Sequence, residues 1–393
     1  MKIIINDPVW KQIFEQPDTT FHEAAENELF QSIPEYARMA GFTQSDMEQL
    51  EKEMADVLSN PDVFHAWSLM RRTILQNGTE GGQAALRDPG FGEPVKNPYA
   101  LFLLVDLAGI PGMIELYKKR GWYESTFHEA LLDFKIWMDF CRDNYDGAFG
   151  LSMTGHPWIR TQLEGNVIRI GRLQCNTRCT FFSEYRIFRH KSDPSIVCPL
   201  LNQELSFNRD GMTAMGDDPV EFKSELVREN GNQITGYAVS KRGIVSPRPV
   251  TLDKSDWDEP VKAGDPVINL HIPADGPMTP ELCRDSFRRM LAFFRDIEHI
   301  DPKAFTCESW LLDPMFRRIL PSTSNVVAFQ DAAWLLPWQG RSELVRRVFG
   351  VKAMTQGIDC VPHRTSMQRA FAEFLNAGGI PRNGAFVFFP EEI

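Results

Sequence analysis

The chain has 393 residues, with 53 acidic side chains against 42 basic ones and a formal net charge of −11. Hydrophobic residues make up 43% of the sequence and aromatic residues 11%, which is enough for a packed core, so we expect a globular protein of about two domains. A chain this acidic repels polyphosphates and anionic headgroups, so we expect it to bind neither nucleic acid nor membranes.

The seven cysteines indicate no disulfide framework, since their number is odd and no C-x-x-C pair occurs. The N-terminal run Ile3-Ile4-Ile5 is too short for a signal peptide. The longest uncharged apolar run, residues 99–105, falls far short of the roughly 20 residues of a membrane helix. We therefore expect a cytoplasmic protein with reduced thiols.

Helical patterns fill the first part of the chain. Thr43 and Asp46 have the spacing of a capping box for the helix that follows, and Asn60-Pro61 starts the next helix, predicted to end near Gly78. Over residues 125–145, apolar residues recur at spacings of four and three, which predicts an amphipathic helix. The Gly-rich stretch 146–157 then predicts a linker. We place a helical N-terminal domain at residues 1–150.

After the predicted linker the pattern changes to short strands. Turn sequences such as Asn208-Arg209-Asp210-Gly211 separate these strand-like runs. The runs lie at 167–175, 180–188, 233–239, 267–272 and 385–389, and helical patterns return at 279–297, 314–320 and 341–349. Residues 151–393 therefore predict a domain of α/β or α+β class.

Several catalytic motifs fail. Walker A, G-x-G-x-x-G and G-x-S-x-G patterns do not occur, and His22 and His128 each start like a zinc-protease helix but lack the second histidine. Cys175, Cys179 and His190 can be combined into a zinc set, but we favour buried thiols. The R-x-x-G-x-G match at 87–92 has no strand before it, so we interpret it as a surface loop.

A predicted strand, a loop and a helix start follow one another between residues 267 and 292. In the strand, Asn269 and His271 alternate with apolar residues, and Thr279 and Pro280 then have the residue types of an N-cap and a first helical position. This order of elements can bind an anion through free N–H groups and the helix dipole. The alternative is an ordinary connection between a strand and a helix.

Glu308 is a carboxylate inside the apolar run 305–312. If it is buried, its pKa rises, which suits a general base; alternatively, it faces solvent or pairs with Arg317 or Arg318. The same two interpretations are open for His271, as a catalyst or as a core residue with its hydrogen bonds satisfied.

Three sequence runs carry a resemblance to a known family. They are IRIGRLQ at 168–174, NLHIP at 269–273 and CESWLL at 307–312, together with Ser324-Asn325 and Phe329-Gln330. They resemble a bacterial family of acyltransferases with an N-terminal helical domain and a GNAT-like C-terminal domain, GNAT being the broad N-acetyltransferase superfamily. The resemblance implies a GNAT-like domain over 151–393, acetyl-CoA or another acyl-CoA as co-substrate, a small-molecule amine as acceptor, and no metal.

The resemblance also implies roles for individual residues. The strand 267–272 is similar to the family strand that pairs with the pantetheine arm. The implied acyl-CoA-binding residues are Ile272, Ala274, Gly276, Thr279 and Arg284. His271 or Glu308 is implied as the base that deprotonates the amine. The family's tyrosine that protonates the leaving thiolate has no counterpart after Tyr237, so Ser309, Ser322, Ser324 or a water is implied in its place.

A non-catalytic protein that binds a small metabolite in the same cleft is the alternative. In that case Trp310, Trp334 and Trp338 would stack on a ring or sugar, whereas core packing is the other explanation for these side chains. The helical domain has two open roles, which are covering the cleft and forming a homodimer.

Overall fold

The computed structural model describes residues 3–75, 82, 84 and 86–393. The chain divides into two compact units. Unit 1 comprises Met1–Arg169 and Pro273–Asp275, and unit 2 comprises Ile170–Ile272 and Gly276–Ile393. The division at residues 169–170 differs from the boundary at 150 that the sequence predicts.

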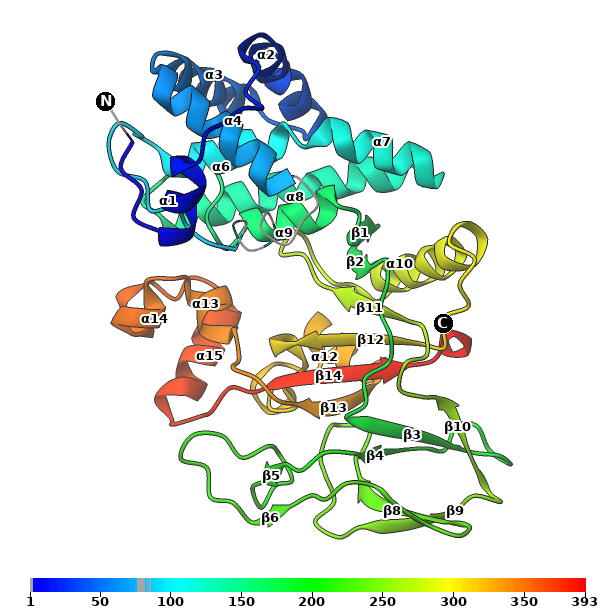
Figure 1. Ribbon diagram of the computed structural model, residues 1–393. Helices are drawn as coiled ribbons and strands as arrows, with labels where there is room; N and C mark the ends of the chain where they lie inside the picture. Colours follow the sequence, from blue (N-terminus) through cyan, green and yellow to red (C-terminus); the bar gives the residue numbers. More distant parts are fainter. Residues whose placement is uncertain (1–2, 76–81, 83, 85) are drawn as a thin grey trace. The chain divides into compact units, whose positions relative to one another are not determined.

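Unit 1 is helical, as the sequence predicts (Figure 1). Its described helices are α1 (Pro8–Glu15), α2 (Glu23–Met39), α3 (Gln44–Leu58), α4 (Pro61–Leu75), α6 (Pro98–Leu107), α7 (Ile110–Arg120), α8 (Glu124–Asn144) and α9 (His156–Leu163). The capping box of α3 is confirmed, because the hydroxyl of Thr43 accepts from the N–H of Asp46 while the carboxylate of Asp46 accepts from the N–H of Thr43. The predicted helix at 125–145 is α8, and the predicted helix end near Gly78 lies outside the described residues.

Helices α6 and α7 form an apolar stretch over Pro98–Arg120 that is long enough to cross a membrane by length and composition alone. In the fold, 67% of its most apolar window is buried within the protein. The core helix of a water-soluble protein has the same property.

The Gly-rich stretch 146–157 is packed into unit 1 instead of linking two domains. Leu151 and Ser152 are buried, and the N–H of Leu151 donates to the carbonyl of Tyr99 at 3.0 Å. Gly150 has φ +136°, and a Cβ there would lie 2.2 Å from the backbone of Tyr99. Glycine at position 150 therefore allows the two backbone segments to lie close together. The glycine content of residues 146–157 alone does not distinguish this role from that of a linker.

The strands, nearly all of them in unit 2, form two larger sheets, one of six strands in the order β1-β2-β11-β12-β14-β13, with residues 167–169 of β1 counted with unit 1, and one in the order β10-β3-β4-β8-β7 with β9 paired to β8. Strands β5 and β6 form a small pair of their own. The strands are β1 (Val167–Ile170), β2 (Leu173–Asn176), β3 (Tyr185–His190), β4 (Val197–Leu201), β5 (Ser206–Phe207), β6 (Phe222–Lys223), β7 (Arg228–Asn230), β8 (Gln233–Ala238), β9 (Val250–Asp253), β10 (Trp257–Val261), β11 (Val267–His271), β12 (Ala304–Ser309), β13 (Trp334–Trp338) and β14 (Asn383–Phe388).

The helices of unit 2 follow the strands of the six-stranded sheet. Helix α10 (Pro280–Ala292) continues into a π-helical turn over Phe293–Ile297, which confirms the predicted helix at 279–297. The remaining ones are α11 (Phe316–Ile319), α12 (Asn325–Asp331), α13 (Leu344–Phe349), α14 (Ala353–Gln356) and α15 (Ser366–Asn376), with 3-10 turns at Trp310–Leu312, Ile358–Cys360 and Pro390–Glu392. The mixed α/β fold class is therefore confirmed.

The run at 180–188 is only partly a strand. Strand β3 begins at Tyr185, and the residues before it are held in a loop, where the N–H of Phe181 donates to the carbonyl of Asp265 at 2.8 Å. The β-like composition of this run therefore reflects burial of its aromatic side chains in the core and not pairing along its whole length.

The two faces of the six-stranded sheet pack differently. On one face, Val267, Ala304 and Val387 belong to a core cluster with Tyr185 and Ile187 of the second sheet. On the other face, the ring of Phe287 on α10 contacts the rings of Phe305 and Phe388, with centroids 5.5 Å and 4.9 Å away. Figure 1 shows β12, β14 and β13 side by side, with β3 and β4 in the second sheet.

Candidate active site

Strands β11 and β12 run parallel, and their pairing ends where the predicted catalytic residues lie. The paired residues run from Val267–Ala304 to Leu270–Cys307. Strand β12 continues beyond this point, but its pairing there is with β14, through Glu308–Ala385 and Ser309–Gly384. The pairing of β11 with β12 therefore ends at Leu270 and Cys307, one residue before β11 ends at His271 and two before β12 ends at Ser309.

The register places His271 and Glu308 on one face of this sheet. Asn269 lies beside Thr306, and side chains along a strand alternate between the two faces. Two residues further along each strand, His271 and Glu308 share that face, which also faces the second sheet. The two residues that the sequence offers as alternative bases are thus brought to the same region.

The imidazole of His271 is largely buried, and the amide of Asn176 is one of its contacts. Its Nε2 lies 2.8 Å from Oδ1 of Asn176 on β2. Burial lowers the pKa of His271 to about 4, because the charged ring loses its hydration. The side chain is therefore neutral at pH 7.

Glu308 is solvent-exposed, yet its pKa is raised. Partial loss of water around the carboxylate is the main cause, the negative charge of Glu184 adds to it, and a hydrogen bond from Trp338 opposes it. Neither arginine considered as a partner reaches it, since Arg317 pairs with Asp331 and Arg318 with Asp210. A carboxylate with a raised pKa and an exposed edge remains suited to accept a proton.

Ser309 lies on the opposite face of β12 from Glu308, because neighbouring strand residues alternate. Its Oγ accepts a hydrogen bond from the N–H of Leu311 at 3.1 Å and so caps the 3-10 turn that follows. This contact gives the side chain a structural role that sequence reasoning did not anticipate.

The loop after β11 leads into α10 as the sequence predicts. Thr279 is the N-cap, and its hydroxyl accepts from the N–H of Leu282 at 3.4 Å, with Pro280 as the first helical residue. Ile272 ends the segment of unit 2 before the loop, and Ala274 is counted with unit 1. Gly276 has φ +71°, which favours glycine, and has open space around its Cα.

Arg172 orients the second half of this loop. Its Nε donates to the carbonyl of Pro277 at 3.1 Å and its Nη2 to the carbonyl of Gly276 at 3.0 Å. In the part of the chain that the structure describes, no protein group accepts from the N–H groups of Gly276 or Met278. With the carbonyls turned to Arg172, these two N–H groups remain without an acceptor among the described residues and can act as hydrogen-bond donors.

A cavity of about 240 Å³ lies between α10 and α12, and Arg284 is in its wall. Its remaining lining is mostly apolar, with Met278, Phe287 and Phe329, and also includes the carboxylate residue Glu392. Of the predicted acyl-CoA-binding residues, Arg284 is the one that lines this cavity. Arg284 is exposed and has no carboxylate partner among the described residues.

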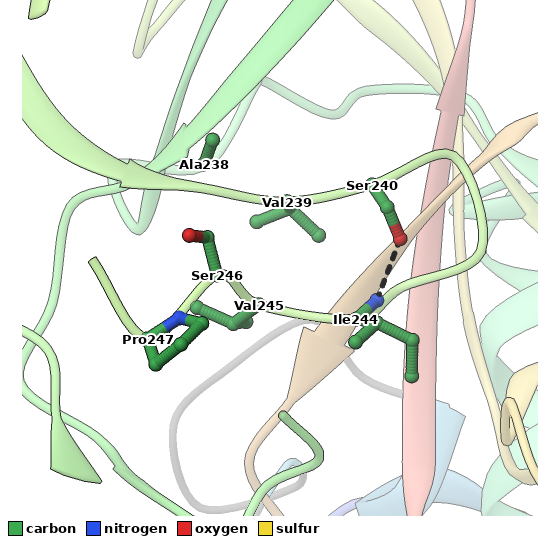
Figure 2. A pocket seen from close by; sticks show the side chains of 7 residues that line it. All are labelled: Ala238, Val239, Ser240, Ile244, Val245, Ser246 and Pro247. Carbon is green, nitrogen blue, oxygen red and sulfur yellow. Dashed lines mark hydrogen bonds between the residues drawn. The ribbon is translucent and has the colours of Figure 1, made fainter. Parts of the chain in front are cut away.

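A second hollow of about 390 Å³ lies at the end of β8 and along the hairpin after it (Figure 2). It is lined by small and apolar side chains from Ala238 to Pro247, and Figure 2 shows the N–H of Ile244 donating to the hydroxyl of Ser240. None of the predicted site residues lines it.

The other candidate residues have structural surroundings. Trp310 packs edge-on against Phe316 and Phe371, and Trp334 and Trp338 pack against the core between the sheets, so packing accounts for all three. In the predicted zinc set, His190 pairs with Ser192. Over the described residues, no group of three or more His, Cys, Asp or Glu side chains is placed to hold a metal ion.

The predicted surface loop at 87–92 is a loop tied to the N-terminal segment. Arg87 pairs with Asp7, and the N–H of Asn6 donates to the carbonyl of Pro89 at 3.0 Å. Sequence reasoning missed Asn176 and Arg172, although both lie in or next to the run that carries the family resemblance. Arg172 is a polar residue inside the predicted strand 167–175 and Asn176 follows that strand directly, which was the available signal.

Comparison with known proteins places these observations in a family. A family model described as a GNAT-like C-terminal domain matches residues 167–388, and one described as an N-acyltransferase N-terminal domain matches residues 31–165. No curated protein matches the chain.

Solved acyltransferase structures share the fold. An acyltransferase mutant in complex with octanoyl-CoA is 17% identical, covers 96% of this chain and 93% of its own, and has a TM-score of 0.60. An acyltransferase in complex with decanoyl-CoA and teicoplanin is 18% identical with the same coverage and a TM-score of 0.59. At this identity the likeness concerns the fold.

Proposed function

Because the chain belongs to the family that joins an N-acyltransferase N-terminal domain to a GNAT-like C-terminal domain, we propose that it transfers an acyl group from acyl-CoA to a small-molecule amine. The observation that carries the proposal is the end of the pairing between β11 and β12 at Leu270 and Cys307, with His271 directly beyond it. Strand backbone without a neighbour has N–H and C=O groups that bind an extended chain, and a pantetheine arm carries amides of this kind.

The acyl-CoA is held, in this proposal, by the loop and helix after β11. The N–H groups of Gly276 and Met278 and the N-terminus of α10 bind the pyrophosphate. The guanidinium of Arg284 adds a positive charge, and the apolar cavity beside it receives an uncharged part of the cofactor. The fold neighbours in complex with octanoyl-CoA and decanoyl-CoA support a medium-chain acyl-CoA as the first compound to test.

His271 serves as the base in this proposal. It takes a proton from the amine as the amine nitrogen attacks the thioester carbonyl carbon, so that a C–N bond forms. The C–S bond then breaks, and the thiolate of CoA takes a proton. The Oγ of Ser309 faces away and caps a turn, so we assign that proton to water.

The proposal is tested by thiol release from octanoyl-CoA with a panel of primary amines that includes teicoplanin. We expect His271→Ala to lower kcat by roughly 10²- to 10⁴-fold, the range of a lost general base. Glu308→Gln should change kcat little, and His190→Ala on β3 is the matched control. A large loss in Glu308→Gln with full activity in His271→Ala would make Glu308 the base. If octanoyl-CoA raises Tm but no amine in the panel is acylated, the non-catalytic alternative replaces this one.

A further inference from the structure

Three strands of the six-stranded sheet are joined by a row of polar side chains that ends at His271. The hydroxyl of Thr306 on β12 donates to Oδ1 of Asn269 at 3.3 Å, and Nδ2 of Asn269 on β11 donates to Oδ1 of Asn176 at 3.1 Å. Nε2 of His271 lies 2.8 Å from the same oxygen of Asn176. We call these four side chains the amide relay.

The register explains why these side chains meet. Asn269 is the neighbour of Thr306 across the parallel pair. In the antiparallel pair of β11 with β2, Leu270 faces Cys175 and His271 faces Gln174, so Asn176 lies opposite Asn269. All four members of the amide relay therefore lie on one face of the sheet. This is the face that also carries Glu308.

The donor and acceptor roles within the amide relay determine the tautomer of His271. An amide oxygen only accepts hydrogen bonds, so both nitrogens beside Oδ1 of Asn176 must donate to it. Nε2 of His271 therefore carries the ring proton. Because a neutral imidazole has one ring proton, the lone pair lies on Nδ1.

Building on the proposed function, we propose that Asn176 is a positioning residue that holds His271 in its Nε2–H tautomer and so makes Nδ1 the atom that accepts the amine proton. Asn269 opposes rotation of the Asn176 amide, since a flip of that amide alone would place its NH₂ group against Nδ2 of Asn269. A substitution of Asn176 that removes the acceptor oxygen therefore changes which ring nitrogen of His271 carries the proton, while the imidazole itself stays in place.

The first test reads the tautomer directly and requires no activity. In the full chain with ¹⁵N-labelled histidine, long-range ¹H–¹⁵N spectra at pH 7 distinguish the two ring nitrogens, and the His271→Gln spectrum identifies the His271 signals. We expect protonated Nε2 in the wild type, loss of this preference in Asn176→Leu, and a proton retained on Nε2 in Asn176→Asp, whose carboxylate still accepts. A wild-type ring protonated on Nδ1, or an unchanged tautomer in Asn176→Leu, would overturn the proposal.

The second test asks whether the tautomer matters for turnover. With octanoyl-CoA and an amine from the panel that the wild type acylates, we expect Asn176→Leu to lower kcat at least tenfold while KM for octanoyl-CoA stays within about twofold. The control is Asn230→Leu, an exposed amide on β7, and Tm checks that both variants are folded. Full kcat in Asn176→Leu would remove Asn176 from the mechanism and leave the proposed acyl transfer intact. An inactive wild type would count against the proposed function, while the spectra still decide the tautomer.

Discussion

The burial that keeps His271 neutral also makes the stability of the fold depend on pH. In the folded chain its pKa is about 4, whereas a histidine in an unfolded chain has a pKa of about 6.5. Between pH 4 and pH 6.5, His271 is protonated in the unfolded chain and neutral in the folded chain. The contribution of His271 is therefore fully present above pH 6.5 and is lost as the pH falls toward 4, by up to about 3 kcal/mol.

Urea unfolding of the wild type and His271→Gln at pH 7 and pH 4.5 checks this prediction. The free energy of unfolding of the wild type should fall more between the two pH values than that of His271→Gln. His128→Gln, at an exposed position on α8, should keep the wild-type pH dependence. Equal pH dependence in wild type and His271→Gln would mean that the ring has the same pKa in the folded and unfolded chains.

Asp313 gives a pH dependence of opposite sign. It is fully buried between the N–H groups of Arg382 and Met315, which donate to its carboxylate at 2.7 Å and 2.9 Å. Burial is the stronger influence and raises its pKa to about 6. The protonated form is thus favoured in the fold, so this contribution is present below about pH 4 and is lost as the pH rises through 6.

The prediction for Asp313→Asn therefore concerns how the free energy of unfolding changes with pH, and not its value at one pH. From pH 4 to pH 7 the free energy of unfolding of the wild type, relative to that of Asp313→Asn, should fall by about 3 kcal/mol. Guanidinium unfolding at four pH values in this range measures the difference. A difference that grows with pH would indicate that the two N–H groups and the charge of Arg382 outweigh burial.

At the scale of elements, β14 depends on a glycine next to the candidate active site. Gly384 lies beside Ser309 in the sheet, and a Cβ on it would be 2.2 Å from the carbonyl oxygen of Leu312. The oxygen is backbone, so relief of the clash requires β14 or the 3-10 turn after β12 to shift. We expect Gly384→Ala to cost about 2 kcal/mol of stability or more.

The matched control is Gly112→Ala on α7, where a Cβ meets no atom within 4 Å. Within a helix, this change should stabilise the protein by about 0.5 to 1 kcal/mol, since alanine favours helix. Thermal unfolding measures both variants. A Gly384→Ala variant as stable as the wild type would show that β14 and the turn separate at little cost.

The elements that the sequence predicts best have their signals within a few residues. The capping box at Thr43 and the cap at Thr279 are local hydrogen bonds, so the residue types alone indicate them. Strand β13, with Pro337 inside it, gives no such signal and exists because it pairs with β14, which lies far along the chain. Glu308 and His271 were found as polar residues in apolar runs, but Asn176 acquires its role only when β2 lies beside β11. Pairing between distant strands is the part that local patterns do not contain.

At the scale of the whole molecule, the two units allow the acyl-CoA-binding segment to be located by calorimetry. Most of the proposed acyl-CoA-binding residues, including Gly276, Thr279 and Arg284, belong to unit 2, whereas Ala274 is counted with unit 1. A ligand stabilises the part of a protein that binds it, by about 2.7 kcal/mol at a concentration one hundred times its Kd. If the units unfold in separate transitions, octanoyl-CoA should raise the Tm of the unit 2 transition and leave the other where it is. Gly384→Ala, whose change lies in unit 2, identifies that transition.

Arg284→Gln separates binding of the acyl-CoA from general stabilisation. Because the guanidinium has no carboxylate partner among the described residues, its loss should leave Tm without ligand nearly unchanged. At a fixed octanoyl-CoA concentration the rise in Tm should shrink, as the affinity falls by roughly tenfold for one lost charged contact. Arg248→Gln, an exposed arginine in the connection between β8 and β9, should keep the full rise. If octanoyl-CoA instead raised the unit 1 transition, or if Arg284→Gln kept the full rise, the acyl-CoA would have to bind elsewhere than at α10, and the base proposed at the end of β11 would lose its substrate.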